Sequence, residues 1–218
     1  MKISIHSIAL TSLIASSVLI STHTSAVEGL SANASLVSQY FFRGVSQTDT
    51  ASASVGVDYK NGNFSLGAWT ADVQDGLEVD LYGSYSFETE SGLSLSAGFT
   101  TYQYTGDFDS AYNEVNLGLS YGIFSLSYNI GTHEEDLGLG IDEADYDFTS
   151  LTIEKDGFYA TLGTWGKDFE GNYAEVGYGT EISGFEIGVA LISNSEELDL
   201  EAGKGDESLV FSIAKTFY

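Results

Sequence analysis

The chain has 218 residues, a formal net charge of −25, 25 Gly, and neither Pro nor Cys. So acidic a protein does not bind nucleic acid non-specifically, because such binding needs Lys and Arg to neutralise phosphates. The absence of Cys excludes disulfides and thiolate metal sites. The absence of Pro suits a chain made mostly of paired strands, in which Pro would remove ladder donors.

The first 26 residues have the pattern of a signal peptide. Lys2 supplies a positive start, residues 3–20 are mostly apolar, and Thr24 and Ala26 stand at the −3 and −1 positions of a signal-peptidase site. A retained membrane anchor is the alternative, but the apolar run is short for one. We therefore expect residues 1–26 to be removed on export and residues 27–218 to form the mature domain.

Beyond the signal peptide, apolar and polar residues alternate, which predicts strands with two different faces. In the segment 77–88, for example, Leu77 and Val79 lie on one face and Glu78 and Asp80 on the other. In a soluble sandwich the apolar face would cover the core, whereas in a membrane barrel it would face lipid. Alternation alone leaves both interpretations open.

The connections favour the barrel. The predicted strands lie at about 30–43, 51–60, 64–72, 77–88, 93–104, 113–121, 123–130, 146–154, 158–165, 172–182, 185–192 and 208–218. Tight turns such as Asn61-Gly62 and Asp156-Gly157 alternate with longer acidic connections, notably 131–145 and 193–207. This sorting predicts an all-β, transmembrane, antiparallel up-and-down β-barrel of about twelve strands, with short periplasmic turns and longer extracellular loops. Its expected location is the outer membrane of a Gram-negative bacterium.

Aromatic residues near the tight turns support the same interpretation. Their positions are typical of an aromatic girdle at a membrane interface. The residues are Tyr59, Phe64, Phe87, Tyr121, Phe124, Phe158 and Phe185. The last strand ends on Phe217 and Tyr218 and resembles the C-terminal targeting strand that the barrel-assembly machinery binds. Lys215, on the lipid side of that strand, would have to reach the interface with its ammonium group.

Three blocks resemble a known family. Residues 38–48, SQYFFRGVSQT, are similar to the opening motif of the poorly characterised TorF-type outer-membrane porins, and residues 67–70 (GAWT) and 78–85 (EVDLYGSY) resemble its next two blocks. The resemblance implies a barrel and, loosely, a pore. That family usually has Asp where this chain has Gln39, so a carboxylate that would partner Arg43 from that position is missing.

A charged constriction is the candidate site. Arg43, the only Arg in the chain, is expected to point into the lumen if Tyr40 and Phe42 face lipid, opposite Glu78 and Asp80. Opposed charges across a narrow lumen filter ions; the alternative is a structural salt bridge that plugs the interior. Further predicted lumen-lining residues are Asp58, Trp69, Tyr82, Glu114 and Glu175. Their acidic excess predicts a preference for cations.

Enzymatic and metal-binding interpretations are weaker. His133, the one His of the mature chain, stands beside acidic residues, and a solvated loop explains it better than a catalytic base of a lipid-modifying enzyme. We expect no enzyme and no cofactor. Weak Ca²⁺ candidates are Asp142, Glu143, Asp145, Glu196, Glu197 and Asp199, but their spacing does not match a calcium-binding loop. Solubility and cation bridging to lipopolysaccharide explain them more simply.

Two functions therefore remain. The first is a passive, cation-preferring porin for small ions or solutes. The second is a structural or surface-interaction barrel with a closed lumen and cation-binding acidic loops. Small inward residues favour an open passage, whereas inward Tyr82, Tyr102 and Tyr159 could fill it. The expected partners are outer-membrane lipid, lipopolysaccharide and the barrel-assembly machinery, with no nucleic acid.

Overall fold

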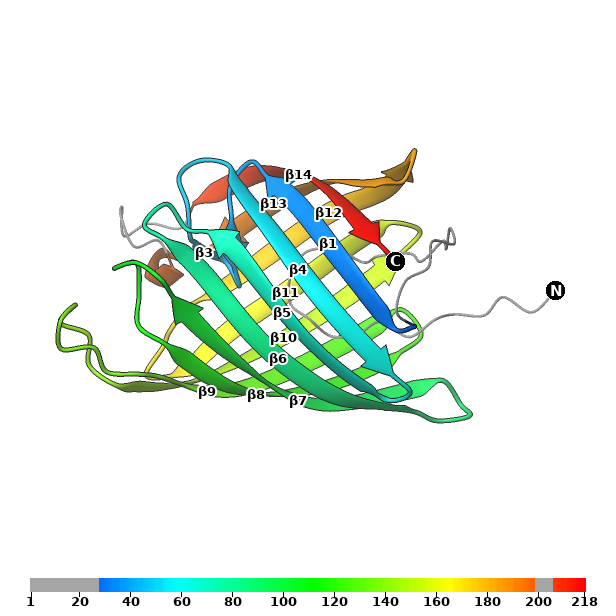
Figure 1. Ribbon diagram of the computed structural model, residues 1–218, viewed down its shortest axis with the longest axis horizontal. Coiled ribbons are helices and arrows are strands. Elements are labelled where there is room, and N and C mark those ends of the chain that lie inside the picture. Colours follow the sequence, from blue (N-terminus) through cyan, green and yellow to red (C-terminus); the bar gives the residue numbers. More distant parts are fainter. Residues whose placement is uncertain (1–27, 199–205) are drawn as a thin grey trace.

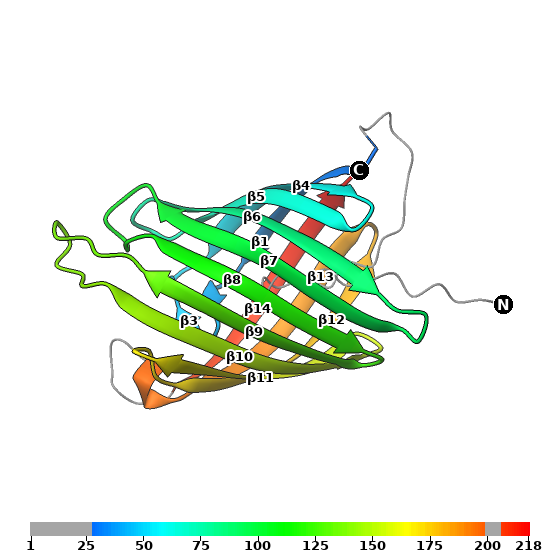
Figure 2. The same ribbon diagram turned by 90° about the horizontal axis from the view of Figure 1, so that it is seen from below.

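In a computed structural model that describes residues 28–198 and 206–218, the chain forms a closed antiparallel barrel (Figure 1, Figure 2). Its twelve strands are β1 Leu30–Val37, β4 Ser52–Asn61, β5 Phe64–Asp72, β6 Leu77–Glu88, β7 Leu93–Tyr104, β8 Tyr112–Tyr121, β9 Phe124–His133, β10 Ala144–Lys155, β11 Phe158–Lys167, β12 Asn172–Ile182, β13 Phe185–Asn194 and β14 Glu207–Phe217. Each pairs with its neighbours in sequence, and β1 closes on β14. The predicted antiparallel up-and-down barrel is confirmed; the predicted signal peptide lies outside the described residues.

The two faces of the barrel differ in polarity. The register keeps Asn33, Gly56, Trp69 and Asp80 at one level on the inward face of β1, β4, β5 and β6. Large apolar side chains point outward and are exposed all around the barrel, as Leu162 is at 63%. A soluble barrel or sandwich would have apolar side chains inside and polar ones outside. The soluble-sandwich alternative is therefore wrong.

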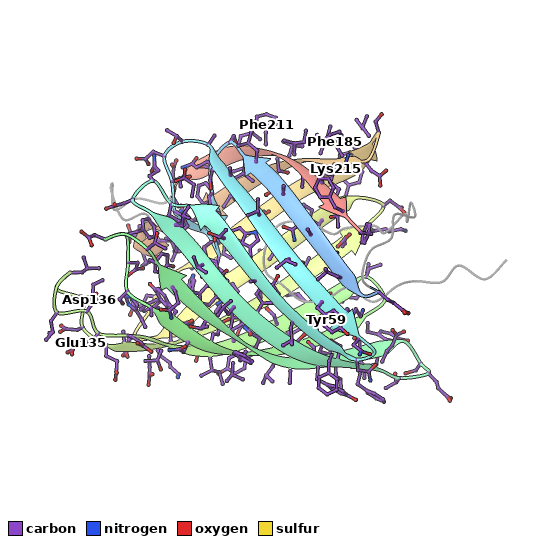
Figure 3. The ribbon with its side chains drawn as sticks, in the orientation of Figure 1. Tyr59, Glu135, Asp136, Phe185, Phe211 and Lys215 are labelled. Atoms are coloured by element: carbon purple, nitrogen blue, oxygen red, sulfur yellow. The ribbon has the colours of Figure 1, made fainter. Side chains whose placement is uncertain are left out.

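The two rims of the barrel also differ. Tight turns join β4 to β5, β6 to β7, β8 to β9, β10 to β11 and β12 to β13, at the rim where β1 begins and β14 ends (Figure 1). Aromatic rings gather there, as in the Phe64–Tyr85 pair with ring centroids 4.8 Å apart, and the Lys215 ammonium lies 4.8 Å from the Phe185 ring. In Figure 3, Tyr59, Phe185 and Lys215 lie toward this rim and Asp136 in a loop of the opposite one.

The first strand is shorter than the sequence predicts. β1 ends at Val37, not near residue 43, and the chain then folds into the barrel as a hairpin of β2 (Phe41–Phe42) and β3 (Val45–Ser46). Arg43 and Gly44 form its two-residue turn with φ of 50° and 86°, the left-handed conformation of tight hairpins. The expectation that Tyr40 and Phe42 face lipid is wrong, because both pack inside the barrel.

Elsewhere the strand ends shift by only a few residues. β9 and β10 extend further toward the loop rim than predicted and pair as far as His133 opposite Ala144, so the loop between them spans 134–143. The described part of the β13–β14 connection includes one 3-10 turn, η1 (Glu196–Leu198). No helix among the described residues is long and apolar enough to cross a membrane.

Four inward tyrosines lie against glycines of the adjacent strand. A Cβ on each glycine would meet the tyrosine ring at 2.3–2.5 Å, so only glycine lets the ring lie flat on the wall. The pairs are Tyr82 on Gly67, Tyr146 on Gly131, Tyr173 on Gly163 and Tyr159 on Gly177. Each ring therefore runs along the wall, which keeps it out of the centre of the lumen.

We predict that Gly131→Ala lowers the free energy of unfolding by about 1–3 kcal/mol, because the new methyl group displaces the Tyr146 ring. Gly179→Ala is the matched control, since a Cβ there would meet only the Ile187 carbonyl oxygen at 3.9 Å. It should change stability by less than about 0.5 kcal/mol. Equilibrium denaturant unfolding of the refolded barrel measures both, and equal losses would contradict the packing argument.

Candidate functional site

The hairpin of residues 38–50 lies in the loop-rim half of the lumen. Its residues enter three buried clusters on different parts of the wall. Tyr40 packs with Ala71 and Val73 at the end of β5, and Phe41 packs with Ile192 and Val210 of β13 and β14. Phe42 and Val45 pack against a third cluster made of Tyr146, Phe148, Trp165 and Leu198. Contacts on several sides hold the hairpin across the lumen.

Arg43, at the tip of the hairpin, forms a buried ion pair with Glu114 of β8. Its two terminal nitrogens donate to the two carboxylate oxygens at 2.6 and 2.8 Å, and the two side chains are 1% and 0% exposed. Glu114 also accepts hydrogen bonds from Tyr146, Tyr102 and Asn116. Burial alone would lower the pKa of the Arg43 guanidinium, but the adjacent Glu114 raises it above its ordinary value, so Arg43 stays charged.

The backbone of the tip is held as well. Trp165 donates its indole N–H to the carbonyl oxygen of Arg43 at 3.1 Å, and Asn194 donates to that of Gly44 at 2.9 Å. The Arg43 guanidinium also lies 4.5 Å from the centroid of the Phe148 ring, within the range of cation–π attraction. Strands β8, β10, β11 and β13 therefore all contact one turn of two residues.

The structure separates the predicted constriction residues into two groups. Glu78 and Asp80 do point inward and are buried, but Arg43 pairs with Glu114, a residue that sequence reasoning placed only among the lumen-lining acids. Glu78 instead accepts a hydrogen bond from the Tyr40 hydroxyl at 3.2 Å. The expected opposition of Arg43 to Glu78 and Asp80 is therefore wrong in its pairing. Alternation placed Glu114 inside, but nothing local could reveal a partner 71 residues away.

The turn-rim half of the lumen is lined differently. The remaining predicted lining residues Asp58, Trp69, Tyr82 and Glu175 all lie on the inward face, although Trp69 packs against Tyr40 of the hairpin. The Tyr82 hydroxyl donates to Asp58 at 2.6 Å, and that of Tyr159 donates to Glu175. Neighbouring inward positions carry mostly Ser, Thr and Gly. The hydroxyl groups of Ser and Thr form hydrogen bonds between adjacent strands, as those of Ser127 and Ser150 do at 2.6 Å. This half is polar and its side chains are small.

His133 is not in a solvated loop, as the sequence suggested, but is the last residue of β9. Its ring stacks on Tyr112 with centroids 4.1 Å apart, and Nε2 lies 2.9 Å from Asp109 Oδ1. Asp109 also accepts a hydrogen bond from the Tyr112 hydroxyl at 2.7 Å. Through this contact and the stacking on Tyr112, His133 joins the 105–111 connection to β9.

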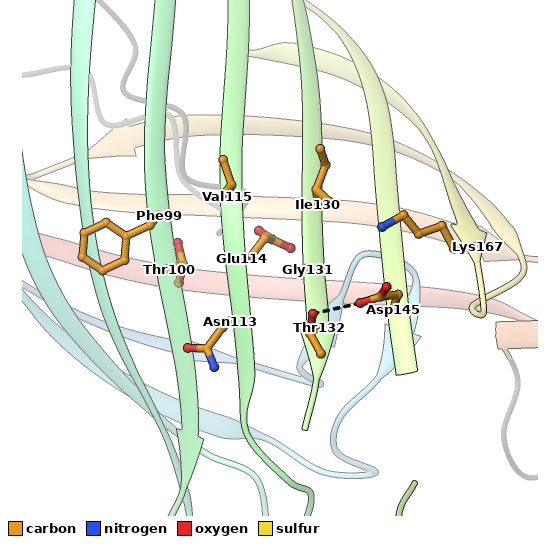
Figure 4. A pocket seen from close by; sticks show the side chains of 10 residues that line it. All are labelled: Phe99, Thr100, Asn113, Glu114, Val115, Ile130, Gly131, Thr132, Asp145 and Lys167. Atoms are coloured by element: carbon orange, nitrogen blue, oxygen red, sulfur yellow. Dashed lines mark hydrogen bonds between the residues drawn. The ribbon is translucent and has the colours of Figure 1, made fainter. Parts of the chain in front are cut away.

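The weak Ca²⁺ candidates do not come together. Within residues 28–198 and 206–218, no three His, Asp or Glu side chains lie close enough to hold a metal ion. Four candidates lie in the connections of the loop rim: Asp142 and Glu143 between β9 and β10, and Glu196 and Glu197 between β13 and β14. Asp199 lies outside the described residues. Asp145 accepts a hydrogen bond from Thr132 at 2.9 Å in a groove of about 350 Å³ on the outer wall (Figure 4). Phe99, Ile130 and Lys167 also line this groove, so it lies where apolar wall meets polar rim.

Comparison with known sequences places the chain in a family. A model described as "Bacterial protein of unknown function (Gcw_chp)" matches residues 21–217. The chain belongs to the Gcw_chp family. The family description states no function, and no curated protein matches the chain in sequence.

One solved structure shares the fold of this Gcw_chp member, and others are more distantly similar to it. One, from work on the "in-meso Crystallization of Membrane Proteins", has a TM-score of 0.58 at 12% identity and covers 86% of this chain and 83% of its own. Pseudomonas aeruginosa OccK2 (OpdF) with glucuronate has a TM-score of 0.43 at 12% identity, covering 88% and 67%. A mutant Rh. blastica porin also scores 0.43 at 12% identity, covering 76% and 55%.

We predict strong coupling between Arg43 and Glu114. Arg43→Met leaves a buried carboxylate without its cation and should cost about 3–5 kcal/mol, and Glu114→Gln should cost a similar amount. The double variant removes both charges but keeps an acceptor for Tyr146, so it should be more stable than either single variant. Unfolding free energies in a double-mutant cycle test this, and additive losses would show that the pair does not act as a unit.

We also predict that acid loosens the 105–111 connection. Burial raises the pKa of Asp109, but hydrogen bonds from His133 and Tyr112 outweigh it and hold that pKa below its ordinary value. The stabilisation is therefore complete above the unfolded pKa of about 4 and is lost as the pH falls below it. Hydrogen exchange should show less protection of the backbone amides in this connection at pH 3 than at pH 6. In Asp109→Asn these amides should be weakly protected at both pH values. Unchanged protection at pH 3 in the wild-type protein would contradict this.

Proposed function

We propose that this protein is an outer-membrane barrel that acts as a passive, cation-preferring channel for small ions or solutes, narrowed at one end by the 38–50 hairpin. The observation that carries the proposal is a closed barrel with an apolar exposed outer face and a polar lumen. In water the outward side chains would form an apolar patch far larger than monomeric soluble proteins expose. In lipid the same face is favourable, and closure leaves no strand edge unpaired.

The lining of the lumen supports passage of small polar species. The turn-rim half carries small polar residues, and Tyr82 and Tyr159 lie along the wall instead of across it. The resemblance of residues 38–48 to the opening motif of TorF-type porins agrees with a pore. Passive transport needs no reaction chemistry, which is consistent with the structural role of His133.

The charge of the lumen supports the preference for cations. Among the described strands and the hairpin, the inward basic residues are Arg43 and Lys60. Inward acidic residues outnumber them and are Asp58, Glu78, Asp80, Glu88, Glu114, Glu154, Glu175, Glu181 and Glu186. Rings of acidic side chains favour cations in narrow pores. Arg43 is neutralised by Glu114, so it does not offset the remaining acids.

A second candidate, a barrel with a closed lumen, is favoured by the anchoring of the hairpin. The buried ion pair and three apolar clusters fix it in place, and long acidic loops at the same rim would meet lipopolysaccharide through divalent cations. Under this candidate the protein acts through its surface and the lumen stays shut. The two candidates differ in one measurable property, which is conductance.

Planar-bilayer conductance of the refolded mature protein in a salt gradient distinguishes them. For a channel we expect discrete steps with a cation-selective reversal potential, and larger steps in Arg43→Ala, because that change releases the hairpin tip. Lys155→Ala, at a tight turn on the opposite rim, is the control and should leave the step size unchanged. A folded wild-type barrel that shows no conductance would contradict the channel function and favour the barrel with a closed lumen.

A further inference from the structure

Within the part of the chain that the structure describes, two buried carboxylates have no partner that neutralises them. Asp80 and Glu78 of β6 are 0% and 1% exposed. Among residues 28–198 and 206–218, no hydrogen-bond donor reaches either oxygen of Asp80 or Oε2 of Glu78, while Oε1 of Glu78 accepts from Tyr40. Residues two apart on a strand lie on one face about 7 Å apart, so the three free oxygens face the same space under the hairpin.

Arg43, the cationic residue of the hairpin, does not neutralise Glu78 or Asp80. Both of its terminal nitrogens are bonded to Glu114, and neither ion pair found among the described residues includes Glu78 or Asp80. The groups around the two carboxylates are aromatic: Tyr40 from the hairpin, and Trp69, Tyr102 and Tyr104 at the opposed positions of β5 and β7. A buried carboxylate without a counter-charge is strongly unfavourable, so these two carboxyls must either take up protons or bind a positive species.

We propose that Glu78 and Asp80 bind one Ca²⁺ ion beneath the hairpin. Asp80 offers both oxygens for bidentate ligation and Glu78 offers one, and Ca²⁺ accepts mixed mono- and bidentate carboxylates in flexible geometry. Its two charges balance the two carboxylates, whereas one proton shared between them would leave a negative charge. Because Tyr40 bonds Glu78, the ion would also fasten the hairpin to β6. The proposal does not rest on conduction, so a non-conducting barrel leaves it intact.

Terbium luminescence and thermal unfolding test the site without any reading of conductance. Tb³⁺ replaces Ca²⁺ at oxygen sites and emits when a nearby aromatic ring transfers energy, and Trp69 lies opposite Asp80 in the register. Because the site is buried, the ion is added during refolding. We expect one Tb³⁺ per barrel with sensitised emission that Ca²⁺ displaces. A Ca²⁺ concentration about a hundred times the dissociation constant should raise the Tm by roughly 5–10 °C relative to EDTA at matched ionic strength.

Matched variants separate this site from the acidic loops. Asp80→Asn and Glu78→Gln should each abolish the Ca²⁺-dependent rise in Tm, while Asp142→Asn with Glu143→Gln should keep it. Trp69→Phe should weaken the sensitised emission and leave the Tm rise unchanged. A Tm of the wild-type protein that is equal in Ca²⁺ and EDTA would overturn the proposal in favour of protonated carboxyls. A rise that survives in Asp80→Asn, or is lost in the loop variant, would also overturn it.

Discussion

The closure of the barrel is the constraint on which the rest of the structure depends. Once β1 pairs with β14, no strand edge remains, and every strand must keep one face toward the lumen and one toward the outside. Backbone that leaves the ladder cannot then lie on an apolar outer face, because its N–H and C=O groups would find no partners there. The 38–50 segment, which follows the end of β1, lies inside the lumen instead, where its side chains pack against several strands of the wall.

The interior is consequently divided into two halves with different physical character. The half that contains the hairpin is packed with aromatic rings around one buried ion pair. The other half has small polar side chains, and its tyrosines are held flat by glycines on the adjacent strand. A lumen filled evenly with small residues would not hold a hairpin, and one filled evenly with rings would leave no polar passage. The division lets one barrel hold a hairpin at one end and carry small polar side chains at the other.

The sequence predicts the barrel well because its main signal is local. A period of two and the turn residues are both readable within a dozen positions, so strands such as 64–72 and 77–88 match the structure in both bounds. The hairpin was missed for the same reason: Tyr40, Phe41 and Phe42 extend the apolar run of β1, and only contacts with distant strands make the segment turn inward. The Arg43–Glu114 pair joins residues 71 positions apart and has no local signature. Alternation could place Glu114 inside the barrel but could not select it over Glu78 or Asp80.

Charge and packing both hold the hairpin. Three apolar clusters bury its side chains against the wall, and its Arg43 neutralises Glu114 but leaves the other acids of the lumen without a counter-charge from the hairpin. The acidic interior attracts the positive charge of Arg43. The bidentate hydrogen bonds then pair Arg43 with one carboxylate, that of Glu114. The acids left over repel one another at short range in a medium of low dielectric constant. On our proposal the arrangement is complete only when a bound cation joins Arg43 and balances the two carboxylates that remain beneath the hairpin.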